Sequence, residues 1–264
     1  EPQTAYGEPI VYPASLYYCE TSVSRKIVEL QQQSIGAWQS GFSIEDLYLS
    51  EEQKEALENS LNHPVSVLTG GPGTGKTTCL KSLIKLLEGN RLKYALASPT
   101  GRAAKRLSSA TGRPASTIHR LLGYSPNKGY QFHEKKPLKI DFLVVDEASM
   151  LDLVLTYHLL GAQKPGTHVL FVGDVDQLPS VGAGDVLRDI IDSGAVPVSR
   201  LTRIYRQEKD SLIIHNAHRI NQGKFPTFSE SKSGDFYLFP AKDAEEAADW
   251  IVDLVSERIP ETFG

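Results

Sequence analysis

A glycine-rich segment at residues 70–77 is the clearest chemical feature of this chain. It reads Gly-Gly-Pro-Gly-Thr-Gly-Lys-Thr and matches the pattern G-x-x-x-x-G-K-[ST] of a phosphate-binding loop. Glycines let the backbone wrap around an anion, and the N–H groups that open the following helix favour negative charge. We therefore expect a nucleotide site made by Gly71, Pro72, Gly73, Thr74, Gly75, Lys76, Thr77 and Thr78.

Two side chains of this loop have roles that follow from their chemistry. The Lys76 ammonium would contact the β- and γ-phosphates of ATP, and the Thr77 hydroxyl would ligate Mg²⁺. The alternative is a glycine-rich turn with a chance lysine. The flanking sequence disfavours that alternative, because residues 65–68 form a strand-like apolar run and residues 76–87 have helical periodicity.

Two adjacent carboxylates, Asp146 and Glu147, follow a second apolar run at residues 142–145. Opposite a phosphate loop, Asp146 would hold Mg²⁺ and Glu147 would polarise the water that attacks the γ-phosphate. The structural alternative is an acidic turn or a helix N-cap, which is common where no phosphate loop is present. Together with the loop upstream, the pair indicates nucleotide hydrolysis.

A third apolar run, residues 169–172, leads into Gly-Asp-Val-Asp-Gln at residues 173–177. Gln177 would hydrogen-bond the γ-phosphate or the attacking water and so report which nucleotide is bound. A polar turn with Asx-type hydrogen bonds explains the same residues equally well. The residues alone leave these two interpretations open.

The composition is that of an ordinary globular protein. The chain has 264 residues, a formal net charge of −4 and two cysteines, with no secretory or membrane-spanning apolar run. We expect a cytoplasmic protein with no membrane partner, no disulfide framework and no zinc site. The net charge leaves room for a local basic groove.

The alternation of strand and helix patterns predicts an α/β fold. We expect a P-loop NTPase with a mostly parallel sheet, helices on both faces, and functional residues at the carboxyl ends of the strands. The expected domains are an N-terminal extension with a helical lead-in (1–48), a motor-like α/β domain (49–232) and the start of a further domain (233–264). The expected strands are 65–68, 94–98, 142–145 and 169–172, and the expected helices are 16–33, one beginning at Ser50, 76–87, 100–110, 117–122, 151–160 and 244–255.

Segments spread along the chain resemble, in order and spacing, the motifs of superfamily 1 DNA helicases. They read TGGPGTGKT at 69–77, SPTGRAA at 98–104, STIHR at 116–120, VDEASM at 145–150, GDVDQLP at 173–179 and LTRIYRQ at 201–207. The RecD-like branch matches best, over roughly residues 45–220. The resemblance implies the first of two RecA-like motor domains, which uses ATP to move along single-stranded DNA in the 5′→3′ direction.

The resemblance also implies roles that spacing alone does not assign. Gln53 stands where similar helicases read the adenine edge, although it also completes a capping box with Ser50. Arg206 matches the arginine finger that reaches the γ-phosphate, with Arg203 as its neighbour, and a guanidinium suits this role. The DNA contacts implied are Thr100, Gly101 and Arg102 in one segment, and Ser116, Thr117 and His119 in another.

One departure from the family concerns the second motor domain, which nothing in residues 221–264 resembles. We therefore expect this chain to be the N-terminal part of a motor whose second domain is its partner, with other protein partners left open. Aromatic residues for base stacking look sparse near the DNA motifs. The competing classes are a small-molecule kinase or switch-type NTPase, which needs a lid or acceptor pocket, and a non-catalytic nucleotide-binding subunit.

Overall fold

The computed structural model describes residues 11–32, 44, 48–203, 211–229 and 234–263 of the chain. The chain divides into two compact units, Glu1–Tyr205 and Arg206–Gly264. The boundary expected near residue 232 falls inside the second unit, so the domain limits remain a prediction. None of the helices in the described part of the chain has the length and apolar character needed to cross a bilayer.

The first unit is built on one sheet whose strand order is β3-β2-β4-β5-β1-β6. Every neighbouring pair in it is parallel. Its strands are β1 (Val65–Gly70), β2 (Tyr94–Ser98), β3 (Ala115–Thr117), β4 (Phe142–Val145), β5 (His168–Gly173) and β6 (Val198–Leu201). The expected parallel sheet is confirmed.

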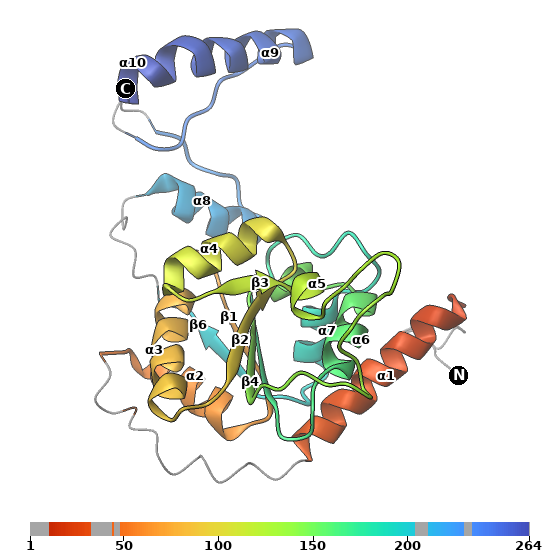
Figure 1. Ribbon diagram of the computed structural model, residues 1–264. Coiled ribbons are helices and arrows are strands. Elements are labelled where there is room, and N and C mark those ends of the chain that lie inside the picture. The colour runs from red at the N-terminus through yellow and green to blue at the C-terminus, as the bar shows by residue number, and fades with distance from the viewer. Residues whose placement is uncertain (1–10, 33–43, 45–47, 204–210, 230–233, 264) are drawn as a thin grey trace. The chain divides into compact units, whose positions relative to one another are not determined.

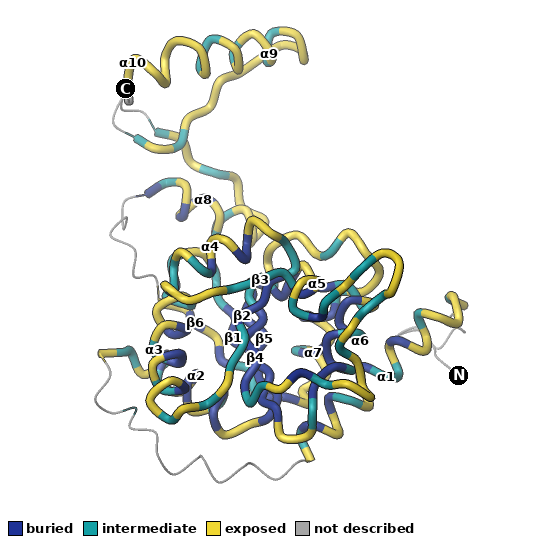
Figure 2. Tube along the Cα trace, in the orientation of Figure 1, coloured by how far each residue is buried: buried dark blue, intermediate teal, exposed yellow. Residues whose placement is uncertain are grey.

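Side-chain alternation along the strands builds a core on each face of this sheet. In β4, Leu143 and Val145 enter one buried cluster, whereas Phe142 and Val144 enter the other. All four are fully buried. A central parallel strand is covered on both faces, which is why its sequence is apolar without interruption. Figure 2 shows the resulting band of buried backbone through the middle of the unit.

Helices cover both faces, as expected (Figure 1). One cluster takes apolar residues from α1, α5, α6 and α7, and the other takes them from α2, α3 and α4. The helices are α1 (Ala14–Gln31), α2 (Glu51–Asn62), α3 (Lys76–Gly89), α4 (Gly101–Thr111), α5 (Ile118–Leu121), the short η2 (Ala148–Met150), α6 (Leu153–Gly161) and α7 (Val186–Asp192).

Some predicted elements differ from those in the structure. The helix expected at 117–122 is shortened at its start, because Thr117 ends β3 and caps α5. Strands β3 and β6 and helix α7 were not predicted. Both strands are short edge strands with polar residues, so they lack the apolar run that marked the central ones.

The second unit contains α8 (Leu212–Asn221), α9 (Ala244–Asp253), the π-helical turn η3 (Leu254–Arg258) and α10 (Ile259–Phe263). The helix expected at 244–255 is therefore present as α9, and it continues through η3 into α10. Helix α9 has no buried residue. Its Ile251 and Val252 side chains are more than half exposed.

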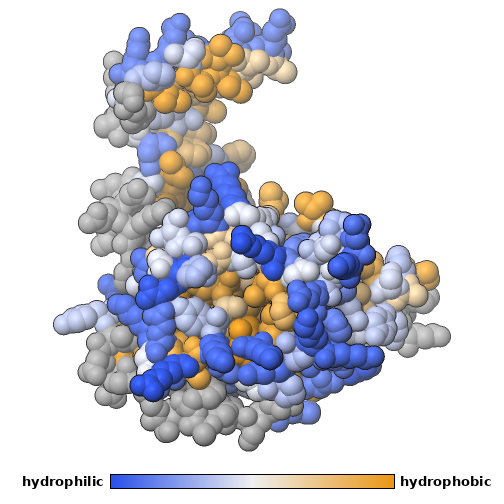
Figure 3. All heavy atoms as spheres, in the orientation of Figure 1, coloured by the Kyte–Doolittle hydropathy of each residue, from blue (hydrophilic) through white to orange (hydrophobic). Residues whose placement is uncertain are grey.

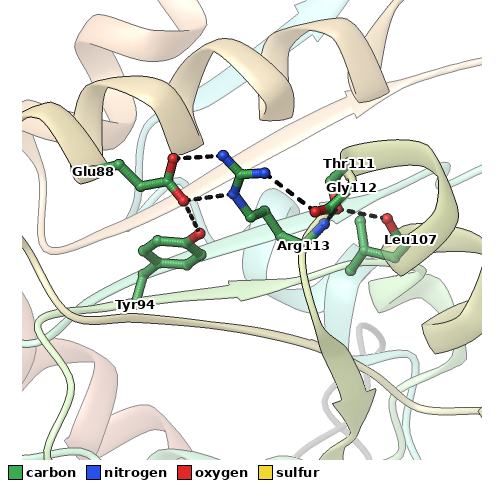
Figure 4. Close-up of polar contacts among 6 residues, drawn as sticks. All are labelled: Glu88, Tyr94, Leu107, Thr111, Gly112 and Arg113. Carbon is green, nitrogen blue, oxygen red and sulfur yellow. Dashed lines mark hydrogen bonds and ion pairs between the residues drawn. The ribbon is translucent and has the colours of Figure 1, made fainter.

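A polar cluster fixes the far end of α4 to α3 (Figure 4). The Arg113 guanidinium, just after α4, donates to both Glu88 oxygens at 2.6 and 2.9 Å. The Tyr94 hydroxyl, at the start of β2, donates to Glu88 at 2.6 Å. These bonds hold the pKa of Glu88 down to about 2, with the Arg113 bond as the main cause. The cluster ties the residue that follows α4 to α3 and to the start of β2.

His168 opens β5 and is a buried histidine whose charging the fold opposes. It is 1 % exposed, and its Nδ1 lies 3.3 Å from the Ser60 carbonyl oxygen. Burial lowers its pKa to about 4. The pKa of an ordinary histidine is near 6.5. Between about pH 6.5 and 4, this histidine is therefore protonated in the unfolded chain and neutral in the folded chain.

We expect this histidine to make the fold acid-sensitive. Its contribution to the free energy of unfolding is complete above about pH 6.5 and is lost as the pH falls toward about 4, on the order of 1–3 kcal/mol. His168→Gln should remove this part of the pH dependence in denaturant titrations. The control His133→Gln removes an exposed histidine and should keep it; equal pH profiles for the two variants would contradict the assignment.

Candidate functional site

The register of the sheet brings the predicted catalytic segments to one edge. Thr69 of β1 pairs with Gly173 of β5, and Val145 of β4 pairs with Phe171 of β5. Because these strands are parallel neighbours, the residues after them emerge together. Gly70, Asp146 and Asp174 therefore start their loops side by side, where open α/β sheets bind ligands.

The phosphate loop has the backbone that its glycines permit. Gly73 and Gly75 have φ angles of 77° and 93°, a region that other residues rarely adopt. Gly70 is required for a different reason, since a Cβ there would lie 2.6 Å from the Leu201 carbonyl oxygen. The Thr74 hydroxyl donates to the Gly71 carbonyl at 2.9 Å and closes the loop on itself.

Lys76, the first residue of α3, places its ammonium inside this loop. Its Nζ donates to the carbonyl oxygens of Gly70 and Gly71, the latter at 3.0 Å. Burial lowers the pKa of Lys76, and the charges of Asp174, Glu147 and Asp146 oppose that effect. The structure thus brings Lys76, Asp146 and Glu147 together as expected. Asp174 is a member of the site that was not predicted.

The surroundings of Asp146 disfavour the charged form of its carboxyl group. Burial, and then the charge of Glu147, raise its pKa to about 6. Its backbone N–H donates to the Ala97 carbonyl at 2.9 Å and extends the pairing of β4 with β2. Thr77 lies exposed in the first turn of α3, and a carboxylate and a hydroxyl supply the oxygen ligands that Mg²⁺ prefers.

Glu147 occupies an uncommon backbone conformation. Its φ and ψ are 56° and 42°, the left-handed region that a non-glycine residue enters at a cost of roughly 1–3 kcal/mol. Outliers of this kind cluster at functional sites. The conformation sends the chain from β4 into η2 and leaves the Glu147 side chain 21% exposed.

Gln177 lies in a polar turn organised by Asp174. The Asp174 side chain, 4% exposed, accepts bonds from the Asp176 N–H at 3.1 Å and from the Gln177 amide at 3.5 Å. The Gln177 N–H donates to the Asp174 carbonyl at 3.2 Å. This is the turn that the structural alternative describes. Gln177 is nonetheless exposed beside the site, so its role toward phosphate stays a prediction.

Gln53 connects α2 to the phosphate loop. The capping box with Ser50 is confirmed, with bonds of 3.3 Å to the Ser50 hydroxyl and 3.1 Å from the Ser50 N–H. The Gln53 amide also donates to the Gly75 carbonyl at 3.4 Å. Gln53 is 4% exposed and already has these partners. The adenine contact is not tested by this geometry and stays a prediction.

Glu52, next to Gln53, is a second residue that sequence reasoning missed. Its carboxylate accepts the Thr202 hydroxyl at 2.5 Å, the Thr202 N–H at 2.9 Å and the Arg203 N–H at 3.4 Å. The bond from the Thr202 hydroxyl is the main reason that the pKa of Glu52 is lowered. Glu52 therefore anchors the segment that leaves β6. Arg206, the predicted arginine finger, lies outside the described residues.

The two predicted DNA segments lie next to each other, one just after β2 and the other at the end of β3. The Thr100 hydroxyl accepts the Ala103 N–H at 3.2 Å and caps α4, while the Thr117 hydroxyl accepts the Arg120 N–H at 3.2 Å and caps α5. A Cβ on Gly101 would lie 4.0 Å from the Thr117 methyl carbon. Arg102 is exposed, and Ser116 lies one residue before Thr117 in β3.

Aromatic side chains gather at His119, contrary to the sequence-based expectation. The Tyr124 and Tyr130 rings lie 5.4 and 6.0 Å from the His119 ring and 4.9 Å from each other. Tyr124 is 47% exposed. Both tyrosines come from the turn-rich segment after α5, which looked separate from the motifs in the sequence and folds back onto His119.

Arg106, in α4, makes a contact with Glu147 that was not predicted. Its Nη1 lies 3.6 Å from the Glu147 Oε1. The sequence carries no local signal for this contact, because Glu147 comes from the end of β4.

The raised pKa of Asp146 predicts that its charge destabilises the fold. The folded chain holds the proton up to about pH 6 and the unfolded chain only up to about pH 4, so the free energy of unfolding falls between these values. Asp146→Asn should raise it at neutral pH by on the order of 1–3 kcal/mol, and little at pH 4. The measurement is denaturant unfolding without nucleotide and with metal chelated.

A matched control for this prediction is Asp141→Asn. Burial opposes the charge of Asp141, but the Lys164 ammonium at 2.9 Å and the Lys93 N–H hold its pKa below the usual range. Its charge is therefore favourable in the fold, and Asp141→Asn should lower the free energy of unfolding at neutral pH. A change of the same sign in both variants would contradict the analysis of Asp146.

Known proteins resemble this chain in sequence and fold. Residues 53–183 match the family described as AAA domain. The ATP-dependent RecD2 DNA helicase of Deinococcus radiodurans is 46% identical over 206 residues, covering 78% of this chain and 28% of that protein. The RecBCD enzyme subunit RecD of Mycobacterium tuberculosis is 36% identical over 230 residues, covering 77% of this chain and 38% of that protein.

A solved structure supports the same fold. The Pif1 helicase from Candida albicans aligns over 83% of this chain and 56% of that chain, with a TM-score of 0.53 and 21% identity. The chain spans 28% and 38% of the lengths of the two curated relatives. From its ordered motifs, its parallel sheet and these relatives, the chain belongs to the RecD-like branch of the superfamily 1 helicases and forms a RecA-like motor domain.

Proposed function

We propose that this chain is the ATP-hydrolysing domain of a DNA helicase or translocase. The observation that carries the proposal is the cluster at the sheet edge, where Lys76 lies inside a phosphate loop and interacts electrostatically with Asp146, Glu147 and Asp174. This cluster combines an anion-binding cation with carboxylates suited to a metal and to water. The names of the relatives support DNA as the polymer on which the motor acts.

Each residue of the cluster has a role that its position supports. The loop N–H groups and Lys76 would bind the phosphates of ATP, and Glu147 would accept the hydrogen bond of the attacking water. Thr77 and Asp146 would hold Mg²⁺, which neutralises charge on the phosphates when it is bound. Gln177 would contact the γ-phosphate side, and Arg206 would complete the site as the arginine finger.

The DNA-facing part of the proposal rests on the segments after β2 and β3. The exposed start of α4, with Gly101 and Arg102, suits a phosphate of the strand, because N–H groups and a cation meet there. The ring cluster of His119, Tyr124 and Tyr130 adds surfaces on which bases stack. We propose single-stranded DNA as the ligand and 5′→3′ as the direction of movement.

Residues 233–264 are proposed to begin a second motor domain, which would be a partner of this one. In support, α9 exposes apolar side chains on a helix that buries none of its residues (Figure 3). A surface of this kind favours a covering partner. A cytoplasmic location belongs to the same proposal, supported by the DNA-processing names of the relatives.

The other function classes have less support. A small-molecule kinase or switch-type NTPase shares the phosphate loop and the Asp146–Glu147 pair. Neither of these two classes explains the predicted DNA segments at the start of α4 and in β3. A non-catalytic nucleotide-binding subunit has no need of the strained Glu147 backbone, whose cost is explained by a chemical role.

Lys76→Ala tests nucleotide binding. Loss of a charged hydrogen-bond donor should weaken ATP binding to this chain about 10- to 100-fold in a titration with a fluorescent analogue. The melting temperature should stay close to that of the wild type, because the side chain projects into the loop. The control Lys81→Ala removes an exposed lysine from the same helix. Unchanged affinity in a folded Lys76→Ala protein would refute the assignment.

Glu147→Gln tests the hydrolytic role. The amide keeps the shape of the side chain but does not act as a base, so turnover of the full-length protein should fall about 10²- to 10⁴-fold while ATP still binds. Phosphate release and analogue binding are measured on the same preparation. The control Glu58→Gln changes an exposed carboxylate of α2 and should leave both unchanged. Loss of binding together with hydrolysis would place Glu147 in another role.

A further inference from the structure

Helix α4 extends from the proposed DNA contact to the proposed catalytic base. It begins with the Gly101–Arg102 segment, and one turn later Arg106 forms an ion pair with Glu147. We propose that Arg106 is a positioning residue that holds Glu147 while DNA is absent, and that DNA binding at the start of α4 frees Glu147 for hydrolysis. This inference rests on the proposed function and adds a route by which DNA stimulates it.

The geometry of α4 connects its two charged contacts. Arg102 and Arg106 are four residues apart, so they lie on the same side of the helix. The opposite side is buried through Ala103, Ala104 and Leu107. Because alanine is small, the helix backbone lies close to the sheet, and a shift at Arg102 is transmitted along a rigid element to Arg106.

The ion pair between Arg106 and Glu147 is weak enough for DNA binding to separate it. Its two charged atoms are 3.6 Å apart, beyond the usual hydrogen-bond distance, and the Arg106 side chain is 76% exposed. Such pairs are weak because water screens them. A phosphate that binds Arg102 and shifts α4 therefore needs to overcome only a weak contact to separate Arg106 from Glu147. A buried bidentate pair in the same place would lock the site.

The pair restrains hydrolysis by holding the Glu147 carboxylate toward α4. A base accepts a hydrogen bond from the attacking water, so its carboxylate must be free to turn toward that water, and the Arg106 charge 3.6 Å from Oε1 favours the other orientation. The left-handed backbone of Glu147 limits the other directions that this side chain can take.

The test compares ATP turnover of the full-length protein with and without oligothymidine. Arg106→Ala should raise DNA-free turnover about 1.5- to 5-fold, the factor that one exposed ion pair supplies. Turnover at saturating DNA should match that of the wild type, so the stimulation ratio falls by this factor. Affinity for the oligonucleotide should be equal or, by linkage, tighter by up to the same factor.

Three further variants separate this device from a structural role. Arg106→Lys keeps the charge with a different reach and should give an intermediate ratio. Arg106→Gln keeps the aliphatic stem and should behave as Arg106→Ala does, which covers the case that the alanine variant is unstable. Lys105→Ala removes an exposed cation one residue earlier and should keep the wild-type ratio.

The contrary outcomes are distinct. A wild-type protein that DNA stimulates, together with an Arg106→Ala variant of unchanged ratio, would overturn the inference and leave the proposed function standing. Reduced DNA-free turnover in Arg106→Ala and Arg106→Gln would also overturn it, because Arg106 would then support catalysis directly. A wild-type protein that hydrolyses ATP without any response to single-stranded DNA would overturn the proposed function and the inference with it.

Discussion

This site depends on the electrostatic interaction between the partly buried ammonium group of Lys76 and the carboxylates around it. Lys76 is held in the phosphate loop by two carbonyl oxygens, and burial works against its charge. Three carboxylates act in the other direction, and each comes from the end of a central strand. These groups meet because β1, β4 and β5 end at the same edge of the sheet. The apolar packing on both faces of these strands keeps them in that register.

Around this centre, the start of α2 joins parts of the chain that are remote in sequence. Gln53 bonds the phosphate loop at Gly75, and its neighbour Glu52 bonds the segment that leaves β6. The start of α2 therefore contacts both the phosphate loop and the segment that leaves β6. Helix α4 likewise extends from the predicted DNA segment at Gly101 to the ion pair between Arg106 and Glu147.

Sequence reasoning found what is local and missed what is assembled by the fold. The phosphate loop, the central strands and the Ser50–Gln53 capping box each have a signal within a few residues, and the structure confirms them. Asp174, Glu52 and Arg106 were missed because their partners come from other elements. The edge strands β3 and β6 were missed because they have no apolar run in the sequence. Only their pairing with β2 and β1 identifies them as strands. The roles of Gln53 and the DNA residues came from resemblance, the residues alone left two interpretations of Gln177 open, and geometry does not assign any of these roles.

The left-handed backbone of Glu147 limits which residues fit at this position. Position 147 has the left-handed conformation that glycine adopts freely, that asparagine tolerates and that glutamate enters at a cost. A chain selected only to fold well would carry glycine there, because most proteins hold little stability in reserve. Replacing Glu147 with glycine would relieve the backbone and remove the carboxylate in one step. Backbone relaxation and side-chain chemistry therefore oppose each other at this single position.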